Sequence, residues 1–251
     1  MPTSLLWLRH DLRLHDHGPL TDALEAAGPD GHMLAVYVID PRDLEETDLG
    51  FRKTEAYRMQ FVLESLHDLR RRMSELGGDL IVRVGKPEEV IPALAGETGA
   101  TIAFVHDEPM REERDLEDAV RDATPGLEWR ATWGHTLVDL EDLPFRIEDA
   151  PDVFTPFRKK VEQAPAQDRY RAPELAPDAL PPPPPGLEVG EIPTLADLGL
   201  ETVPKDERNG LRIRGGETEG LARLHAYFWD LDRLRTYKET RNGMLDPDDS
   251  S

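Results

Sequence analysis

Short apolar runs alternate with amphipathic stretches through the first 160 residues of the chain. Runs such as Ser4–Leu8 and His32–Ile39 have the length of a strand and end at charged or turn residues. Between the runs, apolar positions recur at the spacing of a helix, as they do from Phe51 to Leu76, where a Gly-Gly pair follows. The pattern predicts strands at 4–8, 32–39, 79–84, 101–105 and 127–132, and helices at 19–27, 51–76, 86–97 and 111–122.

This alternation is typical of parallel strands joined by right-handed crossovers, so it predicts an α/β fold with a doubly wound sheet. Ligands of such sheets bind beyond the carboxyl ends of the strands. No G-x-G-x-x-G and no phosphate-loop lysine motif follows a predicted strand, which disfavours a conventional dinucleotide or nucleoside triphosphate site. The candidate ligand loops are Arg9–Asp16, Asp40–Leu44, Gly85–Lys86 and His106–Pro109.

The character of the chain changes after Gln163. Half of the 22 prolines lie beyond this residue, and five consecutive prolines at 181–185 predict extended polyproline. We therefore expect a Pro-rich linker draped over a surface or partly disordered, with the buried core confined to the first 160 residues. Helical spacing returns from Gly216 to Leu231, which predicts a short helical segment with little to pack on.

The chain carries 51 acidic and 30 basic residues, a formal net charge of −21. The acidic residues are dispersed, which favours a solvated coat of the halophilic kind over a face that binds a basic partner. Such a charge repels nucleic acid over most of the surface and leaves only a local basic patch for it. The chain has no cysteine, no apolar run of membrane-spanning length and no secretory signal pattern, so we expect no disulfides, no membrane insertion and a cytoplasmic protein.

The exit of the first strand, WLRHDLRLHDHGPL, resembles the entry motif of the photolyase/cryptochrome family. The resemblance implies that Arg9 and Asp11 grip the polar edge of an antenna chromophore; the alternative is a salt bridge within the loop. The matching residues are Arg9, Asp11, Leu12, Arg13 and Asp16, while His17 stands where the family has Asn.

His15 and His17 form an H-x-H pair with His10 nearby. A metal site needs three or four converging ligands, and such a pair in a loop is common by chance. We therefore predict no metal site.

The exit of the fourth strand, HDEPMREERD, resembles the family segment that follows the same strand. The resemblance implies that Asp107 and Glu108 accept hydrogen bonds from the amino and ring N–H groups of a folate or deazaflavin antenna. The alternative is a charged first helical turn whose acidic side chains favour the helix dipole.

Two C-terminal segments, GGETEGLARL at 215–224 and YKETRNGMLDPDDSS at 237–251, resemble the entrance to the family's FAD-binding domain. The resemblance implies that Tyr237, Ser250 and Ser251 lie near the flavin diphosphate and that Arg241 lies near the DNA backbone. Asp249 replaces a family Tyr, and carboxylates beside a diphosphate repel it.

The chain thus resembles the N-terminal part of a DASH-type photolyase/cryptochrome. The resemblance implies a Rossmann-like, five-stranded sheet of order 3-2-1-4-5. It also implies an antenna-binding domain at 1–135, a linker at 136–210 and the start of the FAD-binding domain at 211–251. Most of the flavin pocket would belong to a helical domain that these residues do not include.

Three functional hypotheses follow. By lineage the chain serves blue-light repair of pyrimidine dimers in DNA, or light sensing, with FAD and an antenna as cofactors. Alternatively it is a non-catalytic module that binds a folate, deazaflavin or nucleotide-like ligand, or the remnant of an interrupted gene with a separately encoded helical half. In each case we expect these residues by themselves to lack catalysis.

Overall fold

The computed structural model describes residues 2–164, 176–204 and 213–241. Five parallel strands form one sheet in the order β3-β2-β1-β4-β5, which confirms the predicted fold class and strand order. Leu5 at the centre of the sheet lies opposite Leu34 on one side and Ala103 on the other. The strands are β1 (Thr3–Leu8), β2 (His32–Ile39), β3 (Leu80–Val84), β4 (Ile102–His106) and β5 (Glu128–Thr132).

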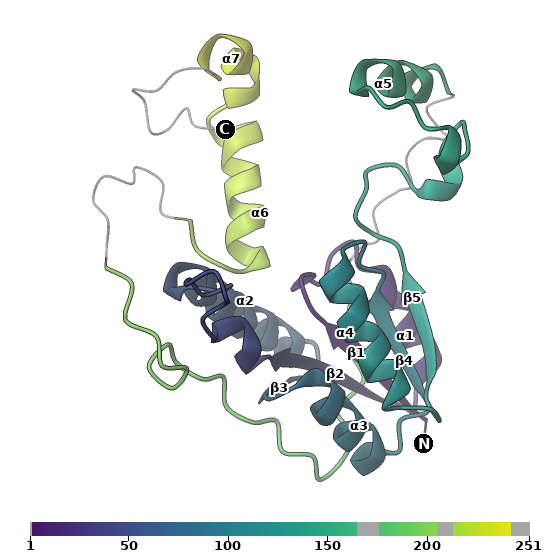
Figure 1. The fold of residues 1–251 in the computed structure, drawn as a ribbon, viewed down its shortest axis with the longest axis vertical. Helices are drawn as coiled ribbons and strands as arrows, with labels where there is room; N and C mark the ends of the chain where they lie inside the picture. Colours follow the sequence, from purple (N-terminus) through teal and green to yellow (C-terminus); the bar gives the residue numbers. More distant parts are fainter. Residues whose placement is uncertain (1, 165–175, 205–212, 242–251) are drawn as a thin grey trace.

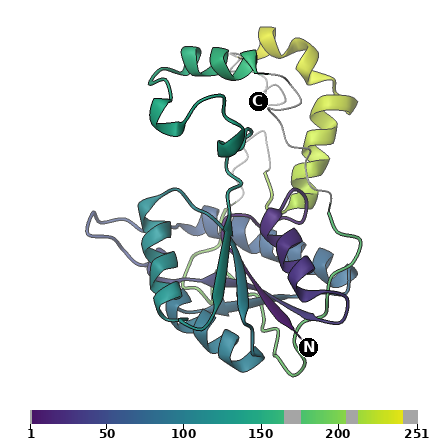
Figure 2. The same cartoon turned by 90° about the vertical axis from the view of Figure 1, so that its right-hand side faces the viewer.

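Helices cover both faces of the sheet (Figure 2). Because side chains alternate along a strand, Leu6 and Leu8 of β1 pack on one face and Leu5 and Trp7 on the other. The first face is covered by α1 (Gly18–Ala27) and α2 (Ala56–Glu75), and the second by α3 (Pro87–Thr98) and α4 (Arg111–Asp122).

Helix α2 begins at Ala56, so the predicted start at Phe51 was wrong. The preceding residues use their backbone groups elsewhere: Thr47 N donates to Phe51 O, and Thr54 N donates to Asp43 O of the short helix η1 (Pro41–Leu44). Two aromatic residues of this helix, Tyr57 and Phe61, are 61% and 46% exposed. The buried apolar residues of α2 are Met59, Leu63, Leu66, Leu69 and Met73.

The linker residues 176–204 lie along the β3 edge of the sheet and beside α2 (Figure 1). Val82 N of β3 donates to Val189 O, so the linker satisfies backbone groups of an edge strand. Leu180, Ile192 and Leu200 are only 6%, 9% and 6% exposed and belong to the core. The prediction of a core confined to the first 160 residues was therefore wrong, because it treated proline content as a sign that nothing is buried.

Beyond the sheet, the chain forms short helices η2 (Leu140–Asp142) and η3 (Ile147–Asp149), then α5 (Phe154–Gln163). The predicted helical segment at 216–231 is α6 (Glu217–His225) followed by a π-helical turn, η5 (Ala226–Asp230), and α7 (Arg233–Thr240) comes next. Helices α5 and α6 both stand above the carboxyl edge of the sheet (Figures 1 and 2).

None of the helices in the described part of the chain is both long and apolar enough to cross a membrane.

Candidate functional site at the carboxyl edge of the sheet

Parallel strands have their carboxyl ends on one side of a sheet, so the loops after β1, β2, β4 and β5 gather at the same edge. The loop after β1 is built around Asp11, whose side chain is buried. Asp11 Oδ1 accepts a hydrogen bond from Arg9 N at 2.7 Å, and Oδ2 lies 2.5 Å from His106 Nδ1 at the end of β4. One carboxylate therefore joins the ends of two neighbouring strands.

His17 completes this buried group. Its Nε2 lies 2.9 Å from Asp11 Oδ2, in a close but poorly aligned contact, and its ring centroid lies 4.7 Å from that of His106. Burial of Asp11 opposes its ionisation, but the hydrogen bond from His106 and the close contact with His17 outweigh this effect and hold the pKa of Asp11 well below its usual value. We therefore treat Asp11 as a carboxylate at neutral pH.

Asp11, His17 and His106 also offer three potential metal ligand atoms within 4.8 Å of one another. The hydrogen bond that His17 Nδ1 accepts from Leu20 N, at 3.0 Å, argues against this use. Because Nδ1 is the acceptor, the ring proton sits on Nε2, and a protonated nitrogen cannot bind a metal. The group fits a hydrogen-bonded support for the N-terminus of α1 better than a metal site.

Arg9 is held from several sides. Its Nη2 donates to His106 O at 2.7 Å and to Glu117 Oε2 of α4 at 2.8 Å, and its guanidinium lies 4.8 Å from the centre of the Trp7 ring. The predicted grip of Arg9 and Asp11 on an antenna remains a prediction. Most of their hydrogen-bonding capacity is directed to the protein itself.

Asp107 and Glu108 follow β4 as the sequence predicted, and Glu108 is only 6% exposed. Glu108 Oε2 lies 3.3 Å from His135 Nε2, while Oε1 is buried with no hydrogen-bond partner among the described residues. A buried carboxylate oxygen without a donor is costly, so this atom is suited to accept a hydrogen bond from a ligand. Asp107 is half-buried and its role as an antenna contact stays a prediction.

A separate cleft of about 1180 Å³ opens at the same edge. Its walls come from the loops after β1 and β2 and from α2, α4 and α6, with Trp7 of β1 among the lining residues. Lys53 Nζ reaches Glu112 Oε2 of α4 at 2.7 Å and so bridges two parts of the rim. Of the four predicted antenna residues, Arg9 lines this cleft.

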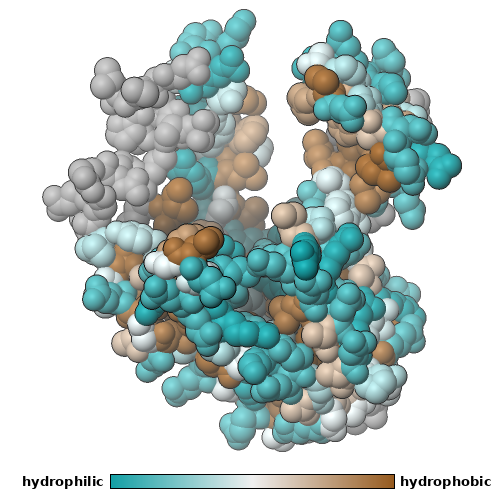
Figure 3. Space-filling model, in the orientation of Figure 1, coloured by the Kyte–Doolittle hydropathy of each residue, from teal (hydrophilic) through white to brown (hydrophobic). Residues whose placement is uncertain are grey.

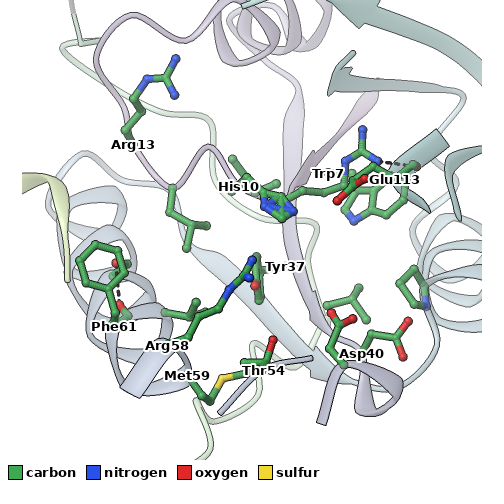
Figure 4. A pocket seen from close by; sticks show the side chains of 18 of the residues that line it. Trp7, His10, Arg13, Tyr37, Asp40, Thr54, Arg58, Met59, Phe61 and Glu113 are labelled. Carbon is green, nitrogen blue, oxygen red and sulfur yellow. Dashed lines mark hydrogen bonds between the residues drawn. The ribbon is translucent and has the colours of Figure 1, made fainter. Parts of the chain in front are cut away.

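The polar groups of the cleft converge on one place. Figure 4 shows Arg58 of α2 extended toward Tyr37 of β2, with His10 facing the same space. Burial, with a smaller contribution from Asp43, raises the pKa of Tyr37 to about 12, so its hydroxyl stays neutral and able to donate. Phe61, 46% exposed in the cleft, adds an aromatic surface, and together with a cationic group and a hydroxyl donor it suits a flat heteroaromatic ligand with an anionic substituent.

Residues 4–183 match the family model described as DNA photolyase. The chain belongs to the DNA photolyase family. It is 49% identical over 253 residues to a cryptochrome DASH from Gloeobacter violaceus, covering 99% of this chain and 49% of that protein. A cryptochrome DASH from Synechocystis sp. is 43% identical and is matched over 100% of this chain and 50% of its own length.

The fold agrees with this assignment. A solved cryptochrome from Synechocystis sp. PCC6803 superposes with a TM-score of 0.90 at 42% identity, covering 100% of this chain and 51% of that one. The chain thus spans about half the length of the curated family members it matches.

Two of the predicted flavin and DNA residues, Tyr237 and Arg241, are not among the residues that line the cleft. Tyr237 is 38% exposed on α7, and Arg241 follows that helix, its backbone N–H donating to Tyr237 O at 2.9 Å. Ser250 and Ser251 lie outside the described residues, so their proposed contact with the flavin diphosphate stays a prediction.

Sequence reasoning did not single out Tyr37 or Arg58, and it named His106 only as the first residue of a candidate ligand loop. Tyr37 lay within an apolar run and Arg58 within a predicted helix. A signal existed for His106, because it ends a strand next to the one that precedes Asp11, and both ends share one edge.

Proposed function

We propose that residues 1–251 bind a light-absorbing antenna and belong to a DASH-type, blue-light-driven flavoprotein. Family membership and the likeness to a cryptochrome support the lineage. In this proposal residues 1–135 form the antenna-binding domain, 136–210 the linker and 211–251 the start of the FAD-binding domain. DNA repair and light sensing are both possible activities of the complete flavoprotein.

The observation that carries the proposal is the cleft at the carboxyl edge of the sheet. A folate or a deazaflavin has a flat ring system with polar edges and an anionic tail. Phe61, which is 46% exposed and lines the cleft, offers an apolar surface for the rings, while Arg58 and Tyr37 offer a cation and a donor for the polar parts. The cleft volume of about 1180 Å³ is slightly larger than the usual range of small-molecule sites, about 300–1000 Å³, so a ligand of this size fits.

The absorption spectrum of the purified chain, or of the chain reconstituted with a folate or a deazaflavin, tests this proposal. We expect a bound chromophore band in the near-ultraviolet or blue. Arg58→Ala should weaken binding at least about tenfold, since it removes a charge-assisted contact. Arg146→Ala, which changes an 80% exposed arginine outside the cleft, should leave binding unchanged.

Glu108→Gln distinguishes the cleft from a second candidate position for the antenna, at Glu108 and His135 after β4 and β5. Loss of the chromophore in this variant, with full retention in Arg58→Ala, would place the antenna at Glu108 and contradict the cleft. A chain that takes up neither chromophore under saturating conditions would contradict antenna binding altogether. Co-purification of a nucleotide instead would favour the non-catalytic binding module.

Exposed apolar residues on α6, η5 and α7 are evidence that a helical partner packs on these segments. Phe228, Trp229 and Leu234 are 39%, 67% and 54% exposed and do not line the cleft, and apolar side chains gather along α6 in Figure 3. Exposed apolar side chains grouped in this way mark an interaction site. We propose that the helical half of the flavoprotein packs here, whether it is part of the same polypeptide or separately encoded.

We also propose that residues 1–251 by themselves neither hold FAD tightly nor repair DNA, because relatives of twice the length supply the rest of the site.

A further inference from the structure

Helix α6 is fastened to the α/β domain by the residues that begin it. Glu217 lies 203 residues from Leu14, yet its Oε2 accepts a hydrogen bond from Leu14 N at 2.8 Å. Its Oε1 accepts another from His15 N at 3.0 Å, and Arg72 of α2 pairs with the same carboxylate. The Glu217 side chain is only 10% exposed, so these bonds are shielded from water.

Asp68 of α2 supplies a second fastening. Gly216 is the N-cap of α6 and has no side chain to accept a hydrogen bond from the first helical turn. Asp68 does so from another helix: its Oδ2 accepts from Thr218 N at 3.0 Å and its Oδ1 from Thr218 Oγ1 at 2.7 Å. Burial opposes the ionisation of Asp68, but the bonds from Thr218 and Arg71 keep its pKa below the usual value.

The two glycines allow this close approach. Gly215 N donates to Glu64 Oε2 at 2.8 Å, and a Cβ on Gly215 would lie 2.7 Å from Ser65 Oγ. Gly216 has a φ of +108°, and a Cβ there would lie 2.7 Å from Asp68 Cβ. A side chain at either position would separate α6 from α2.

The partners on α2 form one stripe. Glu64, Asp68 and Arg72 are spaced by four residues and therefore lie on one face of the helix. They meet Gly215, Thr218 and Glu217 respectively.

We propose that Glu217 is a positioning residue that fixes α6 as a wall of the cleft and ties it to the loop after β1. Gly216, Glu217, Gly220, Leu221 and Leu224 line the cleft from α6 and the residue before it, and Arg9, His10 and Arg13 line it from the loop. Since Glu217 accepts hydrogen bonds from Leu14 N and His15 N, α6 is held at a fixed position relative to the loop after β1. The loop also carries Asp11, so the fastening connects α6 to the buried histidine group. The proposal concerns the position of α6 and does not depend on which ligand occupies the cleft. Its tests measure hydrogen exchange and a distance, so its failure can be told apart from a failure of antenna binding.

Amide hydrogen exchange tests the bonds directly. In Glu217→Gln and Glu217→Ala, exchange at the amides of Leu14 and His15 should accelerate at least about tenfold, because each loses a hydrogen bond to a charged acceptor. Glu219→Ala is the matched control: Glu219 is on the same helical turn, is 53% exposed and lies 3.9 Å from Arg214. Arg72→Gln should give a smaller effect, since it leaves both backbone bonds to Glu217 in place. Unchanged exchange at Leu14 and His15 in the Glu217 variants would overturn the proposal.

The distance from α6 to the opposite wall tests the positioning role. The chain has no cysteine, so spin labels at Asp118→Cys on α4 and Arg223→Cys on α6 would be unique. We expect one narrow distance distribution in the parent and in Glu219→Ala, and a broad one in Glu217→Ala. A narrow, unshifted distribution in Glu217→Ala would overturn the proposal.

A milder variant guards against loss of folding. Glu217→Gln keeps the shape of the side chain and removes its charge, so if Glu217→Ala does not fold, Glu217→Gln should still broaden the distance distribution. Thr218→Val removes the hydroxyl bond to Asp68 but leaves the bonds from Leu14 N and His15 N to Glu217 in place, so its distribution should stay narrow. If Glu217→Gln leaves the distribution narrow, the proposal is wrong.

Discussion

His17 Nε2 lies 2.9 Å from Asp11 Oδ2, so a single carboxylate connects the loop after β1 to the residue that caps α1. The same carboxylate reaches His106 on β4. This arrangement makes Asp11 the centre of the strand ends rather than a side chain directed at solvent.

Asp11→Asn should lower the free energy of unfolding by about 3 kcal/mol at pH 7, because it breaks a buried charged group. Denaturant unfolding measures this, with Asp118→Asn on the exposed side of α4 as the control. The pKa of Asp11 is depressed in the folded chain, so its stabilisation is fully present above the unfolded value of about 3.9 and is lost as the pH falls through the folded value. As the pH falls below about 4, the free energy of unfolding of the variant should therefore decrease less than that of the parent. Equal decreases for the two proteins would contradict the role of Asp11.

Gly134→Ala should destabilise the chain by about 1–3 kcal/mol, the usual cost of overpacking. A Cβ at Gly134 would lie 2.6 Å from His106 Nε2 and would push the ring away from Asp11. Gly126→Ala is the matched control, since a Cβ there meets no atom of the described residues within 4 Å. Equal thermal unfolding of the two variants would show that His106 has room to move.

Leu180→Ala should cost about 2–4 kcal/mol, the usual range for a large-to-small change in a core. Leu180 is 6% exposed and packs against Gly78 between α2 and β3, although it precedes the five prolines by one residue. Leu137→Ala, at an 82% exposed site, should change stability by less than about 0.5 kcal/mol. If both variants unfold alike, the linker does not contribute to the core in solution.

The stability of the chain should rise with salt, because screening weakens the repulsion within a net charge of −21. Thermal melts at about 0.1 M and about 2 M KCl measure the effect. Since salt also strengthens apolar burial, the same pair of melts on a near-neutral relative is the control. Equal or lower melting at high salt would refute the halophilic interpretation.

Purified residues 1–251 should carry no stoichiometric FAD and should not split thymine dimers under blue light. Tyr237, Ser250 and Ser251 could supply a few hydrogen bonds of about 1 kcal/mol each. Association costs on the order of 4–15 kcal/mol of translational and rotational freedom, so little net affinity remains. Flavin absorbance and a repair assay decide this, and retention of FAD would contradict it. Restoration of both by an added helical half from a relative would support the proposed packing on α6 and α7.

The sequence by itself determined the five strands of the sheet and the helices between them, in their order along the chain, apart from the start of α2. The strand His32–Ile39 and the helix Arg111–Asp122 have the predicted bounds, because the spacing of apolar residues follows directly from the geometry of a strand or a helix. The parallel sheet followed from the alternation of the elements, and its strand order also required the family resemblance. Asp107 and Glu108 were placed correctly after β4 for the same reason.

Only the tertiary structure decided which side chains meet. Asp11 and His106 are 95 residues apart, and Glu217 and Leu14 are 203 apart. No local period relates such residues, because their contact depends on which strands are neighbours and on where a helix from a distant segment comes to lie. The burial of Leu180 within a Pro-rich linker and the convergence of Tyr37 and Arg58 on one cleft have the same origin. The local pattern of apolar residues determines the secondary structure of each segment. Long-range packing determines which side chains from distant segments come into contact.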